Sequence, residues 1–99
     1  MKFSIDGLNK IFESRIKLGV MSALAANGSL DFTSLKEYFD VTDGNLASHL
    51  KALEKEEYIV VEKSFIGRKP NTKYTITRTG RIAFEEHLTA LEKLINSHK

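Results

Sequence analysis

Short polar side chains cluster between positions 42 and 51, where the sequence reads TDGNLASHLK. If this cluster contacts a nucleic acid, Asn45 and Ser48 are the best candidates for hydrogen bonds to the edges of its bases. An amide can bond bidentately to adenine, and a hydroxyl can bond to purines and pyrimidines alike. His49 could face the same bases, or it could be a partly buried histidine with its hydrogen bonds satisfied. A helix-capping Asn45 and an ordinary surface Ser48 are the corresponding structural alternatives.

Basic residues are distributed unevenly along the chain, although its formal net charge is only +2. From Lys63 to Phe84 there are six basic residues and no Asp or Glu. Such a segment fits contact with a polyanion, although a solvated hairpin would have the same composition. The candidates for contact with a nucleic-acid backbone or minor groove are basic residues and polar residues near helix starts: Thr33, Ser34, Lys36, Thr42, Lys51, Arg68, Lys69 and Lys73.

Catalysis finds little support in the residue types. The sequence has no Cys, which excludes a thiolate metal site and a cysteine nucleophile. His49, His87 and His98 fall in different parts of the chain, and no pair has the spacing of ligands on one helical turn. Glu85-Glu86-His87 is more typical of a charged helix face than of a metal site. We therefore expect no enzyme activity, no catalytic or metal-binding residues and no cofactor.

The length of 99 residues predicts a single domain, residues 1–99. With 41% hydrophobic and 28% charged residues, the chain can bury one modest core. No apolar run is long enough to span a membrane, and no signal peptide is recognisable. A cytoplasmic protein without a membrane partner is the expectation.

The polar cluster lies at the start of a predicted amphipathic helix, from Val41 to about Glu57. Thr42 is a good N-cap for this helix, and Leu46, Leu50 and Leu53 follow at i, i+4 and i+7 on one face. A shorter helix from Phe32 to Phe39, which Thr33 would cap, comes directly before it. Two helices joined by a tight turn are the layout of a helix-turn-helix, whose second helix enters the DNA major groove. An ordinary buried helical hairpin is the alternative.

The other predicted elements complete a recognisable order. They are a helix from Leu8 to Ala26 ended by Asn27-Gly28, a strand stub at 29–32, strands from Tyr58 to Phe65 and from Thr72 to Thr77 around a turn at 67–71, and a last helix from Thr77 or Thr79 to about Ser97. A hairpin that follows a helix-turn-helix is a wing. The predicted fold is therefore a winged helix-turn-helix, mainly α (α+β).

The same residues carry a family resemblance. The run SRIKLGVMSAL, the segment DGNLASHLKALE, the wing sequence KSFIGRKPNT and the closing TRTGR together resemble small winged-helix regulators related to the MarR and ArsR families. The resemblance covers the chain from about Leu8 to Ile95. It implies a bacterial- or archaeal-type transcriptional regulator that binds double-stranded DNA. Two positions depart from the pattern: Glu57 stands where Gly is usual, and Asn71 where another Arg is common.

The last helix, at about 79–97, has a continuous apolar stripe that predicts a homodimer. A monomer would leave much of this surface wet, and contiguous apolar patches usually mark an interface. The residues expected in the dimer interface are Ile5, Leu8, Phe12, Phe84, Leu88, Leu91 and Ile95. Such a dimer would present two recognition helices to an inverted repeat. The alternative function is a winged-helix protein–protein interaction module that does not bind DNA.

Overall fold

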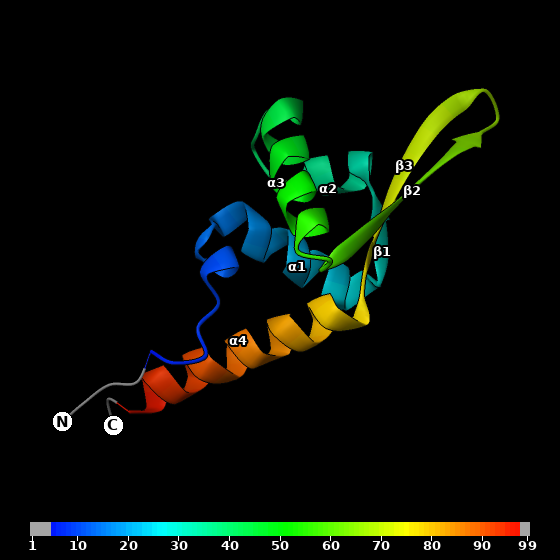
Figure 1. The fold of residues 1–99 in the computed structure, drawn as a ribbon. Coiled ribbons are helices and arrows are strands. Elements are labelled where there is room, and N and C mark those ends of the chain that lie inside the picture. The colour runs from blue at the N-terminus through cyan, green and yellow to red at the C-terminus, as the bar shows by residue number, and fades with distance from the viewer. Residues whose placement is uncertain (1–4, 98–99) are drawn as a thin grey trace.

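A helix-turn-helix and a long hairpin lie on one side of the last helix in the computed structural model, which describes residues 5–97 (Figure 1). The elements in chain order are the 3-10 helix η1 (Lys10–Glu13), α1 (Arg15–Asn27), β1 (Ser29–Asp31), α2 (Phe32–Tyr38), α3 (Asp43–Lys55), β2 (Ile59–Ile66), β3 (Lys69–Ile76) and α4 (Arg78–Asn96). This is the predicted winged helix, mainly helical with a small antiparallel sheet. None of the described helices is long and apolar enough to cross a membrane.

The start of the first helix differs from the prediction. The apolar period predicts one helix from Leu8 to Ala26, but the chain forms η1, opens into an extended conformation at Ser14 and only then enters α1. The Ser14 hydroxyl accepts a hydrogen bond from the Lys17 N–H, and the Asn9 side chain accepts one from the Ile11 N–H. Ser and Asn side chains bond to nearby backbone in this way at helix starts. The apolar period therefore continues across two separate helices.

The cap of α2 also differs from the prediction. The predicted cap, Thr33, lies inside the helix, and the N-cap is Asp31, whose carboxylate accepts a hydrogen bond of 2.8 Å from the Ser34 N–H. This hydrogen bond, together with one from the Ser34 side chain, holds the pKa of Asp31 below its usual value. The helix therefore begins with its own negative charge next to the positive end of its dipole.

The start of α3 is as predicted. The Thr42 hydroxyl accepts a hydrogen bond of 3.1 Å from the Asn45 N–H, which caps the first turn. Leu46, Leu50 and Leu53 are at most 1% exposed. They belong to one core cluster with buried side chains of α1, α2 and the sheet: Val20, Met21, Leu24, Leu35, Ile59 and Tyr74.

The sheet has the strand order β1-β3-β2, and both pairs are antiparallel. The predicted stub pairs with the later strand: Leu30 lies opposite Tyr74. The turn predicted at 67–71 is shorter than expected, because Ile66 already pairs with Lys69 and only Gly67 and Arg68 connect the strands. Gly67 has a φ of +65°, which suits a glycine at the first position of a two-residue hairpin turn.

Pro70 fits within β3 because that part of the strand has a partner on one side only. It lies opposite Phe65 of β2, while β1 reaches only positions 73–75 of β3. A proline cannot donate to a strand ladder, so it is tolerated where one edge of the strand is open.

Thr77 joins the wing to α4. Its hydroxyl accepts the hydrogen bond of the Gly80 N–H, as predicted for the helix cap, and donates to the Glu57 carbonyl at 2.7 Å. The Thr77 N–H donates to the Tyr58 carbonyl. Position 80 must be glycine, because a Cβ there would collide with the backbone of Tyr58. These contacts fix the base of the wing against the end of α3 and the first turn of α4.

Phe12 and Phe84 are core residues, which corrects their assignment to a dimer interface. They are 3% and 8% exposed, and their rings meet edge to face with 5.9 Å between centroids. The apolar stripe of α4 led to the wrong assignment of Phe84, because different parts of the stripe have different surroundings. The N-terminal half of the stripe covers the core, while Leu88 and Ile95 further along remain exposed.

Glu57 has a left-handed backbone with a φ of +63°, the only positive φ of a non-glycine residue within positions 5–97. This is the position where glycine is usual in the sequences that the chain resembles. The connection from α3 to β2 therefore has the backbone that a glycine would favour, and Glu57 adopts it at a steric cost.

We predict that Glu57→Gly raises the free energy of unfolding by up to about 1 kcal/mol, because relief of left-handed strain exceeds the added freedom of the unfolded chain. The backbone hydrogen bonds of Glu57 to Glu54 and Thr77 do not depend on its side chain. Urea unfolding would measure the change. The matched control is Glu56→Gly, at a position with a right-handed φ of −79°, where glycine should lower stability. Destabilisation by both changes would contradict the strain at Glu57.

Candidate nucleic-acid interface

The exposed face of α3 carries the side chains that the sequence suggested for base contacts. Burial of the leucine stripe turns Asn45 and Ser48 outward, and both are exposed. The Asn45 N–H is used by the Thr42 cap, but its side-chain amide makes no hydrogen bond within residues 5–97. An exposed, uncommitted amide near the start of a helix can approach the edge of a base.

Lys51 is also exposed on α3, one turn after the polar cluster. Lys55, four residues later, is exposed as well and was missed by the sequence reasoning. Its spacing from Lys51 was a usable signal, because residues four apart are neighbours on a helix surface. The outer side of α3 therefore places polar side chains near its start and ammonium groups towards its end.

His49 lies at the edge of this face. It is half-buried, and its pKa is lowered, first by burial and then by the nearby positive charge of Lys17 in α1. The lowered pKa keeps most of the ring neutral near pH 7, so His49 adds little positive charge to this face. The structure thus favours the buried alternative over a base contact.

An ion pair spans the turn of the helix-turn-helix. The Lys36 ammonium of α2 lies 3.0 Å from a carboxylate oxygen of Asp43, the first residue of α3. The Asp43 side chain is 78% exposed, so the pair contributes at most about 1 kcal/mol to stability. Its electrostatic consequence matters more, because Lys36 offsets an acidic charge that would otherwise repel phosphate. Lys36 was expected to bind phosphate, but Asp43 already partly neutralises its charge.

The start of α2 is a poor site for phosphate. Thr33 is exposed, but the Ser34 N–H is already bonded to Asp31, whose carboxylate is negative. A second anion would be repelled there. The expected contacts of Thr33 and Ser34 with a nucleic-acid backbone therefore have little support in the geometry.

The wing projects from the body on the same side as the N-terminal end of α3 (Figure 1). Arg68 forms its tip, and Lys69 starts the returning strand; both are exposed. Lys73 lies nearer the base, with Asp31 opposite on β1 and Glu62 opposite on β2. Opposite charges across the strands balance Lys73 locally. The positive charge available to a partner is therefore concentrated at the tip.

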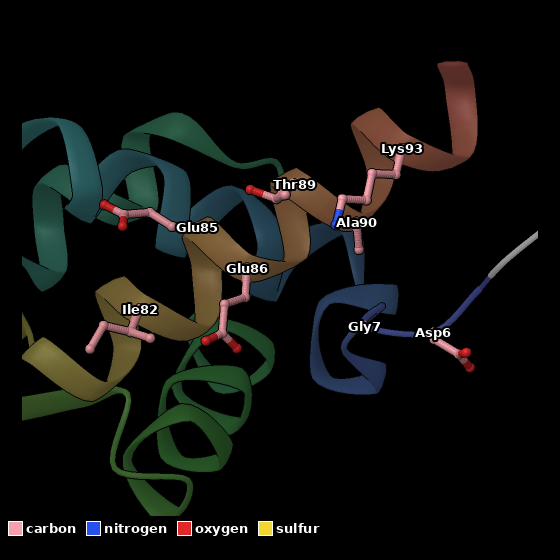
Figure 2. A pocket seen from close by; sticks show the side chains of 8 residues that line it. All are labelled: Asp6, Gly7, Ile82, Glu85, Glu86, Thr89, Ala90 and Lys93. Carbon is pink, nitrogen blue, oxygen red and sulfur yellow. The ribbon is translucent and has the colours of Figure 1, made fainter. Parts of the chain in front are cut away.

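The other end of the molecule holds a groove between α4 and the N-terminal segment, which is residues 5–9. The groove has a volume of about 580 Å³. Figure 2 shows Asp6 and Gly7 across from the α4 side chains, among which Glu85 and Glu86 are acidic. Among the described residues, no group of three or more His, Cys, Asp or Glu is placed to hold a metal ion. The groove has the wrong charge for a nucleic acid.

His87 anchors the N-terminal segment beside this groove. Its Nδ1 accepts a hydrogen bond of 2.9 Å from the Asn9 N–H, and the Asn9 side chain donates to the Tyr58 hydroxyl. Burial lowers the pKa of His87, which keeps the ring neutral and able to accept. His87 is thus structural, and His98 lies outside the described residues.

Comparison with known families agrees with this geometry. Residues 16–95 match the model of a family described as winged helix DNA-binding domain. An uncharacterized protein of Methanocaldococcus jannaschii is 35% identical over 85 residues, which cover 86% of this chain and 92% of that protein.

Solved structures share the fold. A transcriptional regulator homologue from Pyrococcus horikoshii superposes with a TM-score of 0.82 at 28% identity, covering 90% of this chain and 88% of that one. The YusO protein of Bacillus subtilis gives a TM-score of 0.77 at 22% identity, covering 86% and 60% of the two chains. A mutant MarR of E. coli, solved with operator DNA, gives 0.70 at 13% identity, covering 83% and 58%. The chain thus shares its fold with these proteins.

Proposed function

This chain belongs to the winged helix DNA-binding domain family, and from that premise we propose that it binds double-stranded DNA sequence-specifically as a transcriptional regulator. One observation carries the proposal: the polar start of α3 and the basic tip of the wing project on the same side of the molecule (Figure 1). A duplex lying along this side can meet both, with α3 in the major groove and the wing on the adjacent backbone or minor groove.

Each part of the surface has its own task. Asn45 and Ser48 read base edges, because their side chains are exposed and Asn45 is uncommitted. Thr42, Lys51, Arg68 and Lys69 contact phosphate or the minor groove and fix the position of α3 without reading sequence. His49 and Lys73 contribute less, since one is half-buried and the other is flanked by acids.

We propose further that two copies associate through the N-terminal segment and the C-terminal half of α4, residues 88–96. This half projects beyond the body with only the N-terminal segment beside it (Figure 1). Ile5, Leu88 and Ile95 are 68%, 39% and 62% exposed there, and Leu8 and Leu91 are partly exposed. Burial of such side chains favours association by about 25 cal/mol per Å² of apolar surface, before the cost of association. A two-fold dimer would place two copies of α3 on an inverted repeat.

We predict that Arg68→Ala combined with Lys69→Ala weakens binding to all duplexes and makes binding less dependent on salt. Titration of wild-type protein with mixed-sequence DNA from low to high salt should first give a steep loss of affinity. The slope of log K against log salt should then fall by roughly one to two units in the double variant, about 0.9 for each phosphate that is no longer neutralised. Lys10→Ala removes a positive charge away from both the wing and α4 and serves as the control. An unchanged slope would remove the wing from the interface, and no binding at any salt would favour a protein–protein module.

We predict that Asn45→Ala costs about 1–3 kcal/mol of binding free energy on the preferred duplex and much less on random DNA. The preferred duplex is the one that the protein enriches from a random library. The cap of α3 survives the change, because Thr42 accepts from the backbone of residue 45 and not from its side chain. Fluorescence anisotropy with both duplexes measures the difference. Equal losses on both would mean that Asn45 positions α3 and reads nothing.

We predict that the protein sediments at twice its single-chain mass of 11.2 kDa at micromolar concentration. Leu88→Lys with Ile95→Lys should yield monomers that bind a half-site weakly, because charged side chains cannot be buried in an apolar interface. Val60→Lys, at another exposed apolar position but on the sheet, should leave the mass unchanged. A wild-type mass near 11.2 kDa would exclude the dimer and the expected inverted repeat.

A further inference from the structure

The wing tip carries two large apolar side chains that the fold does not use. Phe65 is 74% exposed and Ile66 is 66% exposed, among the highest values of the large apolar residues described. Both are at the end of β2, directly before the Gly67-Arg68 turn. Neither side chain belongs to the hydrophobic core or packs against it, so both are available to a partner.

The strand register shows what surrounds each side chain. Side chains two apart on a strand share a face, so Phe65 lies on the same face as Lys63 and opposite Pro70. Ile66 lies on the other face, opposite Lys69. Phe65 therefore has Lys63 on its own face and Arg68 in the adjoining turn as cationic neighbours along the chain.

We propose that Phe65 inserts into the DNA minor groove and partly unstacks one base step beside the bases that α3 reads. This inference rests on the proposed DNA binding and deepens it, since it assigns a specificity-determining role to an uncharged residue of the wing. Apolar side chains used in this way by minor-groove proteins separate neighbouring base pairs and kink the duplex. The flanking cations hold the phosphates on either side of the groove.

Charge favours DNA as the occupant of this surface. Within the hairpin from Ile59 to Ile76, Glu62 is the only acidic residue, and it lies near the base opposite Lys73. An apolar tip surrounded by uncompensated cations would be poorly matched to an apolar protein groove, whereas it complements a polyanion with a π-stacked interior.

The wing tip should lose little conformational entropy when Phe65 inserts into DNA. Its strands are paired up to Ile66 and Lys69, and Pro70 fixes one backbone torsion directly across from Phe65. A two-residue turn leaves little freedom at the tip, so less ordering is needed on binding. Unstacking is easiest at pyrimidine–purine steps, so a TA or CA/TG step should be preferred where the wing contacts the site.

The test uses the full-length protein and the duplex that it enriches from a random library. The fluorescent adenine analogue aminopurine replaces adenine at successive positions, because its emission rises when the base unstacks. Wild-type protein should raise the emission at one step beside the α3 footprint. Phe65→Ala should abolish that rise and weaken binding on the order of tenfold, as expected when one aromatic ring no longer stacks on a base. The salt slope should not change, because the substitution removes no charge.

Ile66→Ala is the matched control, since it removes an equally exposed apolar side chain from the opposite face of the same tip. It should preserve the emission rise and change affinity less than about twofold. Urea unfolding should be similar for both variants, because neither residue is in the core.

The outcomes separate this inference from the proposed function. Binding by wild-type protein without an emission rise at any step would overturn the insertion of Phe65 and leave DNA binding intact. Equal effects of Phe65→Ala and Ile66→Ala would also overturn it. A change of sedimenting mass in either variant would assign the tip to a protein contact. Failure of wild-type protein to bind any duplex at low salt would overturn both proposals together.

Discussion

Burial of three leucines on one face of α3 is the constraint on which the candidate interface depends. Leu46, Leu50 and Leu53 are almost fully buried, and each contributes about 1.5–3 kcal/mol relative to an exposed side chain. A rotation of α3 by one residue would turn the helix by about 100° and expose part of this stripe. The outward direction of Asn45 and Ser48 is therefore held by apolar packing on the opposite side.

A second constraint fixes the wing relative to α3. The Thr77 hydroxyl bonds to the Glu57 carbonyl, the Thr77 N–H bonds to the Tyr58 carbonyl, and Gly80 packs against the Tyr58 backbone. These contacts join the end of α3, the base of the wing and the start of α4 within a few residues. A rigid junction of this kind lets two surfaces from different elements meet one partner without a large loss of entropy.

Charge is distributed so that the wing tip differs from the rest of the surface. Lys36 offsets Asp43 at the start of α3, and Asp31 and Glu62 lie on either side of Lys73. Within the described hairpin the tip has no such acidic partners, which explains how a chain of net charge +2 can present a local basic surface. The groove beside α4 has the opposite character, with Glu85 and Glu86 along its wall. The two ends of the molecule thus suit different partners.

The sequence by itself determined the elements that local signals encode. The period of three leucines and the Thr42 cap predicted α3, and β-branched residues predicted the wing strands, because these signals act over a few residues. The start of α4 was predicted at Thr77 or Thr79, and the structure has its cap at Thr77. The polar cluster and the basic segment were visible for the same reason. Competing caps were harder to rank: Asp31 outcompeted Thr33, and Ser14 interrupted a helix that its apolar period favoured.

Only the tertiary structure decided which side of each element is available. Phe12 and Phe84 share an apolar period with exposed residues, yet their rings meet in the core, whereas Leu88 and Ile95 extend past it. His49 is half-buried, and Lys36 reaches Asp43 across a turn. Sequence spacing gives the face of a helix but not what packs against it, because burial and ion pairing depend on residues that are distant along the chain and become neighbours only after folding.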